Sequence, residues 1–151
     1  MEPTQAPAAD PGRFDGGCLC GAVRYRAGAA PVLRFNCHCR DCQRTTGSGF
    51  APFAVFDEAA LAIAGDCRFH AGTGGSGGRV ERGFCPGCGA SLFVRAQLVP
   101  GRLFVLAGTL DDPSSFAPRA HIHARHAPPW NTLDPALPAF PGAAPATPPG
   151  G

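Results

Sequence analysis

The sequence contains no lysine, so all 13 of its basic residues are arginine. A lysine Schiff base and a lysine that grips a phosphate are therefore excluded as catalytic devices of this chain. The formal net charge is only +2, which argues against a surface built to bind DNA, RNA or an anionic membrane. We accordingly expect neither a nucleic-acid partner nor a membrane partner.

Long apolar runs are also missing from the sequence. No uninterrupted stretch approaches the roughly 20 residues that are needed to span a bilayer. Residues 1–12 carry Glu2 and Asp10 ahead of any basic residue and lack the apolar centre of a secretory signal. We therefore expect a cytoplasmic protein, in which eight cysteines are better suited to metal binding than to disulfides.

Helical patterns are scarce, whereas 21 glycines and 17 prolines interrupt the chain. Short apolar or alternating segments bounded by these residues predict strands at 22–26, 50–56, 61–63, 68–70, 79–84, 91–95 and 102–107. Short helical turns are expected near Thr45 and at Pro113–Phe116. The sequence thus predicts a mainly β fold.

Both ends of the chain are rich in proline and alanine and have no periodicity. This composition predicts a disordered N-terminal arm at 1–12 and a disordered tail at 141–151, around one domain at 13–140. The glycine run at 72–78 is not followed by the Gly-Lys-Ser/Thr of a phosphate-binding loop. We interpret it as a mobile loop between two strands.

Seven of the eight cysteines fall into three groups: Cys18 and Cys20, then Cys37, Cys39 and Cys42, then Cys85 and Cys88. On an extended segment, residues i and i+2 point to one side, so the first pair can present two sulfurs to one ion. The same holds for Cys37 and Cys39, with Cys42 reaching back from the following turn. Cys67 stands alone beside a predicted strand and is expected to be a small core residue.

The Cys85–Cys88 segment is predicted to form a metal-binding knuckle. Pro86 fixes φ at the first central position of a tight turn, and Gly87 tolerates a positive φ at the second. A redox Cys-x-x-Cys motif would normally open a helix, but residues 91–95 have the pattern of a strand. This context favours metal binding over thiol–disulfide exchange.

Ligand counting predicts one closed site and one open site. Four thiolates complete a tetrahedral zinc site, and joining the first pair to the knuckle leaves Cys37, Cys39 and Cys42 as a set of three. Three protein ligands leave one coordination position for water or substrate. The spacing alone also permits a single four-cysteine site made of Cys37, Cys39 and the knuckle.

Further motifs surround the cysteines. They are GCLCGAVRY at 17–25, NCHCRDCQ at 36–43, TGSGF at 46–50, RGFCPGCGASL at 82–92, AGTLDDP at 107–113, and the pairs at 121–122 and 129–130. Together, over about 14–141, they resemble the glutathione-dependent formaldehyde-activating enzyme family, also called the GFA or centromere-protein-V-like domain. The resemblance implies an Mss4-like fold of twisted antiparallel sheets.

The same resemblance implies a role for each cysteine group. Cys18, Cys20, Cys85 and Cys88 would hold a structural zinc, and Cys37, Cys39 and Cys42 a second, catalytic zinc with an open position. The implied enzyme is a carbon–sulfur lyase in which a thiol such as glutathione lies at the open position and its sulfur adds to formaldehyde or a related aldehyde, or leaves it. The rival hypotheses are a non-catalytic zinc-binding module and a thiol-based reductase on an Mss4-like fold.

Several polar residues beside the cysteines are candidates for binding or structural roles. Arg40 and Arg44 flank the open group and are candidates for binding a glutathione carboxylate, or else are solvated. His38 alternates away from its cysteine neighbours, so we expect it to be exposed or hydrogen-bonded and not a ligand. Asp41 is expected to cap a helix.

Three histidines follow in the C-terminal part of the domain. His121, His123 and His126 are expected to form a pocket wall or a strand face near Trp130, in preference to a fourth ligand or a base. His123 and His126 stand where members of the resembled family often carry an aromatic residue and a serine. We expect this difference to alter the lining of the pocket and therefore the substrate.

Overall fold

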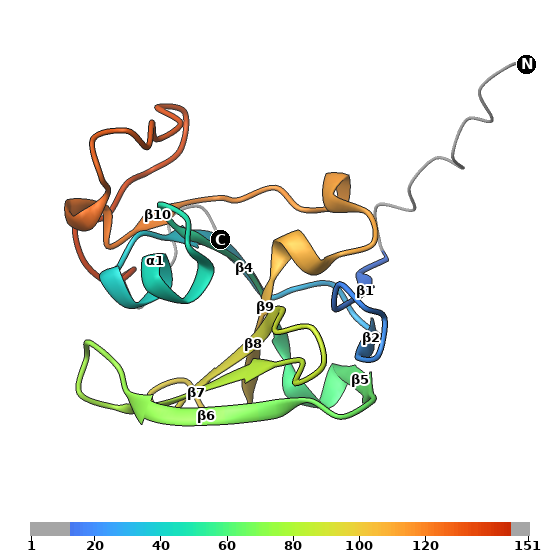
Figure 1. Cartoon of the computed structure of the whole chain (residues 1–151). Coiled ribbons are helices and arrows are strands. Elements are labelled where there is room, and N and C mark those ends of the chain that lie inside the picture. Colours follow the sequence, from blue (N-terminus) through green and yellow to red (C-terminus); the bar gives the residue numbers. More distant parts are fainter. Residues whose placement is uncertain (1–12, 146–151) are drawn as a thin grey trace, which may run out of the picture.

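The computed structural model describes residues 13–145 and contains two β-sheets and one α-helix (Figure 1). The smaller sheet has the order β1 (Asp15–Gly17), β2 (Arg24–Ala27) and β5 (Leu61–Ala64). The larger sheet has the order β10 (His121–Ile122), β3 (Leu33–Cys37), β4 (Ala51–Asp57), β9 (Arg102–Leu106), β8 (Ser91–Ala96), β7 (Arg79–Phe84) and β6 (Arg68–Thr73).

The helices are short. Helix α1 (Arg40–Thr46) follows β3, and 3₁₀ turns occur at η1 (Glu58–Ala60), η2 (Ala107–Thr109), η3 (Pro113–Ser115) and η4 (Ala124–His126). In residues 13–145 no helix is long and apolar enough to cross a membrane. The predicted N-terminal arm lies outside the described residues, and of the predicted tail only 141–145 are described.

The mainly β prediction is confirmed, and each predicted strand overlaps an observed one. Three strands were not predicted, because β1 is mostly glycine, β3 mixes charged and apolar residues, and β10 has only two residues. The strands of residues 13–145 pair antiparallel, except that β10 pairs with β3 in parallel. The long connection from β9 to β10 allows this parallel entry, since parallel neighbours need a crossover.

Strand β4 is buried on both faces, which explains why its sequence is almost continuously apolar. Ala54 and Phe56 pack into one core, whereas Phe53 and Val55 pack into a second core on the opposite face. Residues of β9 divide in the same way, with Leu103 and Val105 in the first core and Leu106 in the second. The larger sheet therefore separates two apolar layers.

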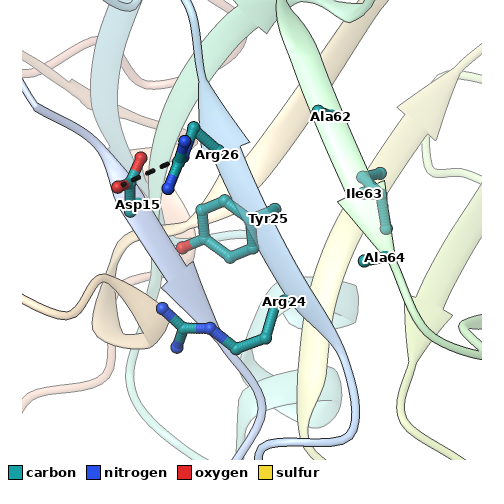
Figure 2. A pocket seen from close by; sticks show the side chains of 7 residues that line it. All are labelled: Asp15, Arg24, Tyr25, Arg26, Ala62, Ile63 and Ala64. Atoms are coloured by element: carbon teal, nitrogen blue, oxygen red, sulfur yellow. Dashed lines mark ion pairs between the residues drawn. The ribbon is translucent and has the colours of Figure 1, made fainter.

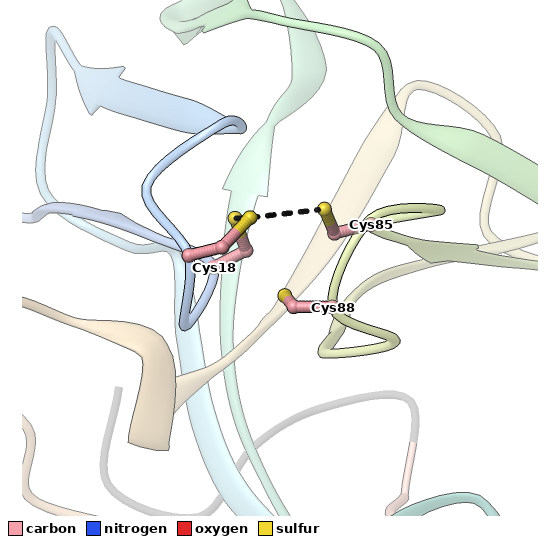
Figure 3. A group of neighbouring side chains, drawn as sticks. Cys18, Cys85 and Cys88 are labelled. Carbon is pink, nitrogen blue, oxygen red and sulfur yellow. Dashed lines mark hydrogen bonds between the residues drawn. The ribbon is translucent and has the colours of Figure 1, made fainter.

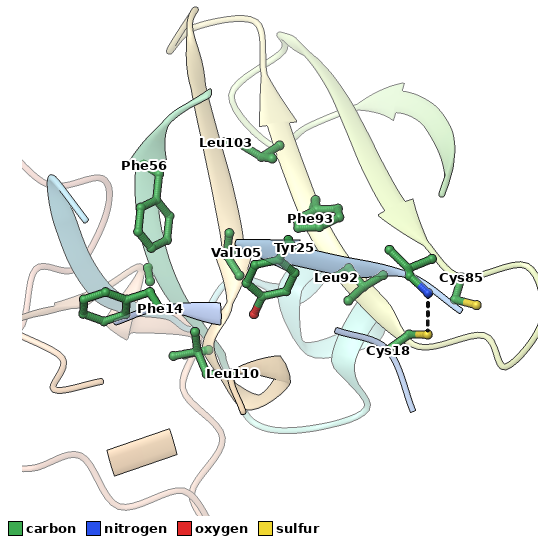
Figure 4. Close-up of a cluster of buried hydrophobic side chains, with 13 residues drawn as sticks. Phe14, Cys18, Tyr25, Phe56, Cys85, Leu92, Phe93, Leu103, Val105 and Leu110 are labelled. Atoms are coloured by element: carbon green, nitrogen blue, oxygen red, sulfur yellow. Dashed lines mark hydrogen bonds between the residues drawn. The ribbon is translucent and has the colours of Figure 1, made fainter. Parts of the chain in front are cut away.

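The first core lies between the larger sheet and the smaller one (Figure 4). Phe14 meets Phe56 edge to face, with ring centroids 5.8 Å apart, and Tyr25 meets Phe93 in the same manner at 5.4 Å. Cys18 and Cys85 belong to this core. The second core, on the opposite face of β4, includes Cys37 and has Cys39 and Cys42 packed against it.

The glycine run forms the turn between β6 and β7, as predicted for a loop between two strands. The Gly74 amide donates to the Gly78 carbonyl at 2.8 Å, and Gly77 adopts a φ of 87°. A positive φ at this point is readily adopted only by glycine. The prediction that this loop is mobile stays a prediction.

Candidate metal centres

The sulfurs of Cys18, Cys20, Cys85 and Cys88 all lie within 4.8 Å of one another (Figure 3). The Cys18 and Cys20 sulfurs are 3.6 Å apart, and the Cys20 and Cys85 sulfurs are 3.8 Å apart. A tetrahedral zinc with bonds of about 2.3 Å has ligand sulfurs about 3.8 Å from one another. Both the donor set and its spacing therefore fit a four-coordinate zinc site, which we call the four-cysteine centre.

Two similar turns build this centre. The Cys18 amide donates to the Val23 carbonyl and the Cys85 amide to the Ala90 carbonyl, each at 3.0 Å. Each turn places a glycine with positive φ directly after its second cysteine, Gly21 at 81° and Gly89 at 77°. The two turns thus aim their sulfurs at one point from strands that are far apart in sequence.

These turns correct two predictions. Cys18 and Cys20 lie in a turn closed by a bond of 3.2 Å from the Gly21 amide to the Cys18 carbonyl, not on an extended segment. In the knuckle, Gly89 has the positive φ and Gly87 does not. The Gly87 Cα faces the sulfurs instead, because a Cβ there would lie 3.6 Å from the Cys85 sulfur.

Backbone amides stabilise negative charge at the four-cysteine centre. The Val23 amide, 3.2 Å from the Cys18 sulfur, and the neighbouring thiols lower the pKa of Cys18 to about 6 against the opposing effect of burial. At Cys20 the Ala22 amide acts in the lowering direction, but the Cys18 and Cys85 sulfurs outweigh it and raise the pKa to about 11. Cys18 therefore ionises before Cys20, as expected where several thiols share one site.

The sulfurs of Cys37, Cys39 and Cys42 form a second group within 4.8 Å, which we call the three-cysteine centre. Cys37 ends β3 and is buried, whereas Cys39 and Cys42 are half-buried on the α1 side. Cys39 is the N-cap of α1, and its sulfur accepts the Cys42 amide at 3.3 Å. A soft three-thiolate set suits zinc and leaves the accessible side at Cys39 and Cys42.

Hydrogen bonds among the three thiols couple their ionisation. Hydrogen bonds from the Cys37 and Cys42 thiols hold the pKa of Cys39 far below its usual range. The same interaction with Cys39 raises the pKa of Cys37 to about 12, and Cys37 and Cys39 together raise that of Cys42. A divalent cation would displace the remaining protons, since thiolates are the metal-binding form.

Comparisons with known proteins bear on both centres. The sequence pattern of the glutathione-dependent formaldehyde-activating enzyme (GFA) family matches residues 13–126. A protein of Halomonas elongata described as "Putative glutathione-dependent formaldehyde-activating enzyme" is 30% identical over 127 residues, which cover 80% of this chain and 81% of that protein. This chain belongs to the GFA family. A crystal structure of a Rhodobacter sphaeroides protein shares the fold, with a TM-score of 0.52, 18% identity and coverage of 84% of this chain and 99% of that one.

Family membership and the two sheets confirm the expected fold, a mainly β, Mss4-like arrangement. Within residues 13–145, the alternative site that joins Cys37 and Cys39 to the knuckle does not occur. Cys67 lies outside both centres and packs against the first core, as expected of a small core residue. That these seven sulfurs hold metal stays a prediction.

The charged residues beside the three-cysteine centre of this GFA-family chain differ in their partners. Arg40 donates to the Gln43 amide oxygen, so its guanidinium is partly engaged. Arg44 lies four residues further along α1 and has no ion pair or side-chain hydrogen bond within residues 13–145. The capping role expected for Asp41 is wrong: Asp41 lies inside the first turn and pairs with Arg82 at 3.7 Å, because Cys39 already occupies the N-cap.

The histidines stay outside both sulfur groups. His38 is buried and hydrogen-bonded, with its Nε2 3.0 Å from the Nδ1 of His121. Burial first, and the nearby His121 second, lower the pKa of His38. His121 lies on β10, and His123 caps η4 with a φ of 52°, the one non-glycine residue with positive φ in the described part of the chain.

Two residues that contact this region were not singled out from the sequence. Gln43 is buried in α1, and Asn131 contacts the His38 ring from a loop. The only sequence signal for Gln43 is its position next to Cys42 in a family motif. Asn131 carries no signal, because a single asparagine in a proline-rich loop is typical of a turn.

The surface of residues 13–145 includes the following hollows. One of about 450 Å³ lies between the end of α1 and the segment after the knuckle, and its lining includes Thr45, Ser48, Ser91 and Thr109. A second, of about 340 Å³, lies on the smaller sheet beside the Asp15–Arg26 ion pair (Figure 2). The third, of about 230 Å³, adjoins β7, β8 and β9. Of these, the first begins one helical turn from Cys42.

Proposed function

We propose that this chain is a zinc-dependent enzyme of the carbon–sulfur lyase type. Its substrate would be the adduct of a thiol, such as glutathione, with formaldehyde or a related aldehyde. The observation that supports this most directly is the three-cysteine centre in a chain of the GFA family. A four-sulfur set is complete, whereas a three-sulfur set leaves one position for a substrate sulfur. The proposed content is two zinc ions per chain.

Zinc held by Cys37, Cys39 and Cys42 would supply a Lewis acid that lowers the pKa of a thiol. The unequal burial of the three cysteines determines the side from which that thiol approaches. Cys37 is buried against the second core, while Cys39 and Cys42 are half-buried at the start of α1. Substrate therefore approaches over α1, and the sulfur end lies at Cys39 and Cys42.

The hollow of about 450 Å³ supports binding of the rest of the thiol, and Arg44, which does not line this hollow, supports it separately from the exposed side of α1. The guanidinium of Arg44 is exposed and lies on the same helix as Cys42, where it can bind a carboxylate through two hydrogen bonds. The Thr46 hydroxyl donates to the Cys42 carbonyl at 2.9 Å, so the hollow is continuous with the helix that carries the ligand. Its hydroxyl lining suits the amide groups of a peptide thiol.

The reaction balances without an external oxidant or reductant. In the synthetic direction the thiol sulfur forms a bond to the carbonyl carbon, the C=O π bond breaks, and the thiol proton ends on the carbonyl oxygen. In the lyase direction the carbon–sulfur bond breaks and the same proton returns to sulfur. The centre thus has to hold the sulfur as a thiolate, for which zinc would supply the positive charge.

The first test is zinc content together with the substitution Cys39→Ser. We expect about two zinc ions in the wild type and one in the variant, with loss of activity, because serine is a poor zinc ligand at this position. Cys67→Ser is the matched control and should keep both ions. Activity must be measured against the uncatalysed rate, since thiols add to formaldehyde without a catalyst.

Other outcomes identify the rival functions. One tightly held zinc and no activity above background would indicate a non-catalytic zinc module. A chain with one zinc and rapid alkylation of Cys39 by iodoacetamide would indicate a thiol-based reductase, because zinc-bound sulfurs react slowly. Full activity in Cys39→Ser would exclude the three-cysteine centre as the active site.

A further inference from the structure

Gln43 joins the three-cysteine centre to a distant part of the chain through its side-chain amide. The residue is only 6% exposed, although it is polar. Its Nε2 donates to the His38 carbonyl and to the His126 carbonyl, both at 2.8 Å, and its Oε1 accepts from Arg40. Both hydrogens of the Gln43 amide are therefore donated, one to His38 and one to His126 in η4. Gln43 thus connects His38 with η4.

His38 lies between Cys37 and Cys39 and makes the second connection. Its backbone amide donates to the Ile122 carbonyl at 3.0 Å, which anchors it to β10. Its ring nitrogens lie 3.0 Å from the His121 Nδ1 and 3.1 Å from the Asn131 Nδ2. Since Gln43 binds its carbonyl, all four polar groups of this buried residue have partners.

The directions of these bonds follow from donor counting. The Asn131 Nδ2 can only donate, so the His38 Nδ1 accepts. A neutral imidazole carries one hydrogen, which then lies on the His38 Nε2 and is donated to the His121 Nδ1. These two bonds hold the His38 ring in one position, while the His121 Nε2 on the far side of the pair is buried without a hydrogen-bond partner within residues 13–145. Gly49 makes room for the Asn131 side chain, because a Cβ at Gly49 would lie 3.0 Å from it.

We propose that residues 121–131 are part of the three-cysteine centre without supplying a ligand. This inference rests on the proposed binding of zinc at the three-cysteine centre. Gln43, His38 and Asn131 are positioning residues that hold the three sulfurs in the geometry the metal requires. Preorganised ligands lose less conformational freedom when the ion binds, and residues that orient metal ligands commonly change affinity 10–100-fold. By linkage, the ion in turn stabilises residues 121–131.

The test uses the full chain loaded with cobalt(II), whose thiolate absorption reports each centre. Gln43→Met keeps the length of the side chain and removes both donors. We expect it to weaken metal binding at the three-cysteine centre by about 10–100-fold and to leave the four-cysteine centre unchanged. Gln97→Met is the matched control, because Gln97 is exposed and its Oε1 accepts only from the Arg79 amide at 3.0 Å.

A second variant and a second readout keep the inference testable if Gln43→Met misfolds, which loss of the four-cysteine cobalt spectrum would reveal. Asn131→Ala removes only the donor to the His38 ring and should weaken the same centre less. Hydrogen exchange of amides in 121–131 should slow when the second zinc binds to the wild type. That protection should be reduced in either variant, an effect that a merely structural role would not produce.

The experiment distinguishes a failure of this inference from a failure of the proposed function. If the wild type binds two metal ions and both variants bind the second one with wild-type affinity, this inference is overturned while the proposed function stands. If the wild type takes no second ion under reducing conditions, the proposed function fails and this inference fails with it. Equal weakening at both centres would show general destabilisation and would also overturn the inference.

Discussion

Gly89 illustrates how one backbone angle supports the four-cysteine centre. It follows Cys88 with a φ of 77°, and its amide donates to the Cys85 carbonyl at 2.8 Å. Gly21 has the same place after Cys20. In the left-handed region a Cβ approaches the following carbonyl too closely, at a cost of about 1–2 kcal/mol.

We predict that Gly89→Ala lowers the free energy of unfolding of the metal-loaded protein by about 1–2 kcal/mol. The cause is conformational and not steric, since a Cβ at Gly89 would meet no atom within 4 Å. Gly72→Ala is the control, because Gly72 has equal space but no positive φ. Urea unfolding measures both, and equal losses would show that the φ of Gly89 is not the cause.

At the scale of an element, β4 is the strand most dependent on apolar side chains. Its two faces contribute to two cores, and its neighbours β3 and β9 are paired along most of its length. Val55 is fully buried in the second core, whereas Val32, just before β3, is 45% exposed. A polar group in place of Val55 therefore meets no water.

We predict that Val55→Thr destabilises the protein by about 1–3 kcal/mol, because it buries a hydroxyl at nearly constant volume. Val32→Thr is the matched change at an exposed site and should stay within about 0.5 kcal/mol. Denaturant unfolding gives both values. Similar effects at the two positions would contradict the burial of β4 on its second face.

At the scale of the whole molecule, the two centres connect the chain over different distances. The four-cysteine centre joins Cys20 to Cys85, which are 65 residues apart, and so ties the turn between β1 and β2 to that between β7 and β8. The three-cysteine centre spans only residues 37–42. Closing a loop removes more entropy from the unfolded chain when the loop is long.

We therefore predict unequal losses of stability. By chain entropy, a cross-link over 65 residues is worth about 4 kcal/mol, and one over the short segment about 2 kcal/mol. Cys20→Ser should lower Tm about twice as much as Cys39→Ser, and Cys20 is exposed, so no core contact is lost. Scanning calorimetry of the zinc-loaded variants measures this, and a larger drop in Cys39→Ser would refute the assignment of a structural role to the four-cysteine centre.

Much of the fold was predictable because its signals are local. The strands β4, β7, β8 and β9 follow from apolar or alternating runs bounded by glycine and proline. β3 was missed because Arg34 and Asn36 interrupt its apolar pattern. Arg34 lies over the Phe14 ring and Asn36 is buried, and neither environment is visible in the sequence. The cap at Cys39 was missed because cysteine is not a usual N-cap.

The sequence by itself determined the candidate ligands, the mainly β class and the family resemblance, since each depends on residues close together in the chain. Only the tertiary structure decided that the seven sulfurs group as four and three on opposite cores, and that Gln43 and Asn131 hold His38. These relations join segments up to 93 residues apart. They depend on which strands pair, and strand pairing is fixed by burial and hydrogen bonding across the whole molecule.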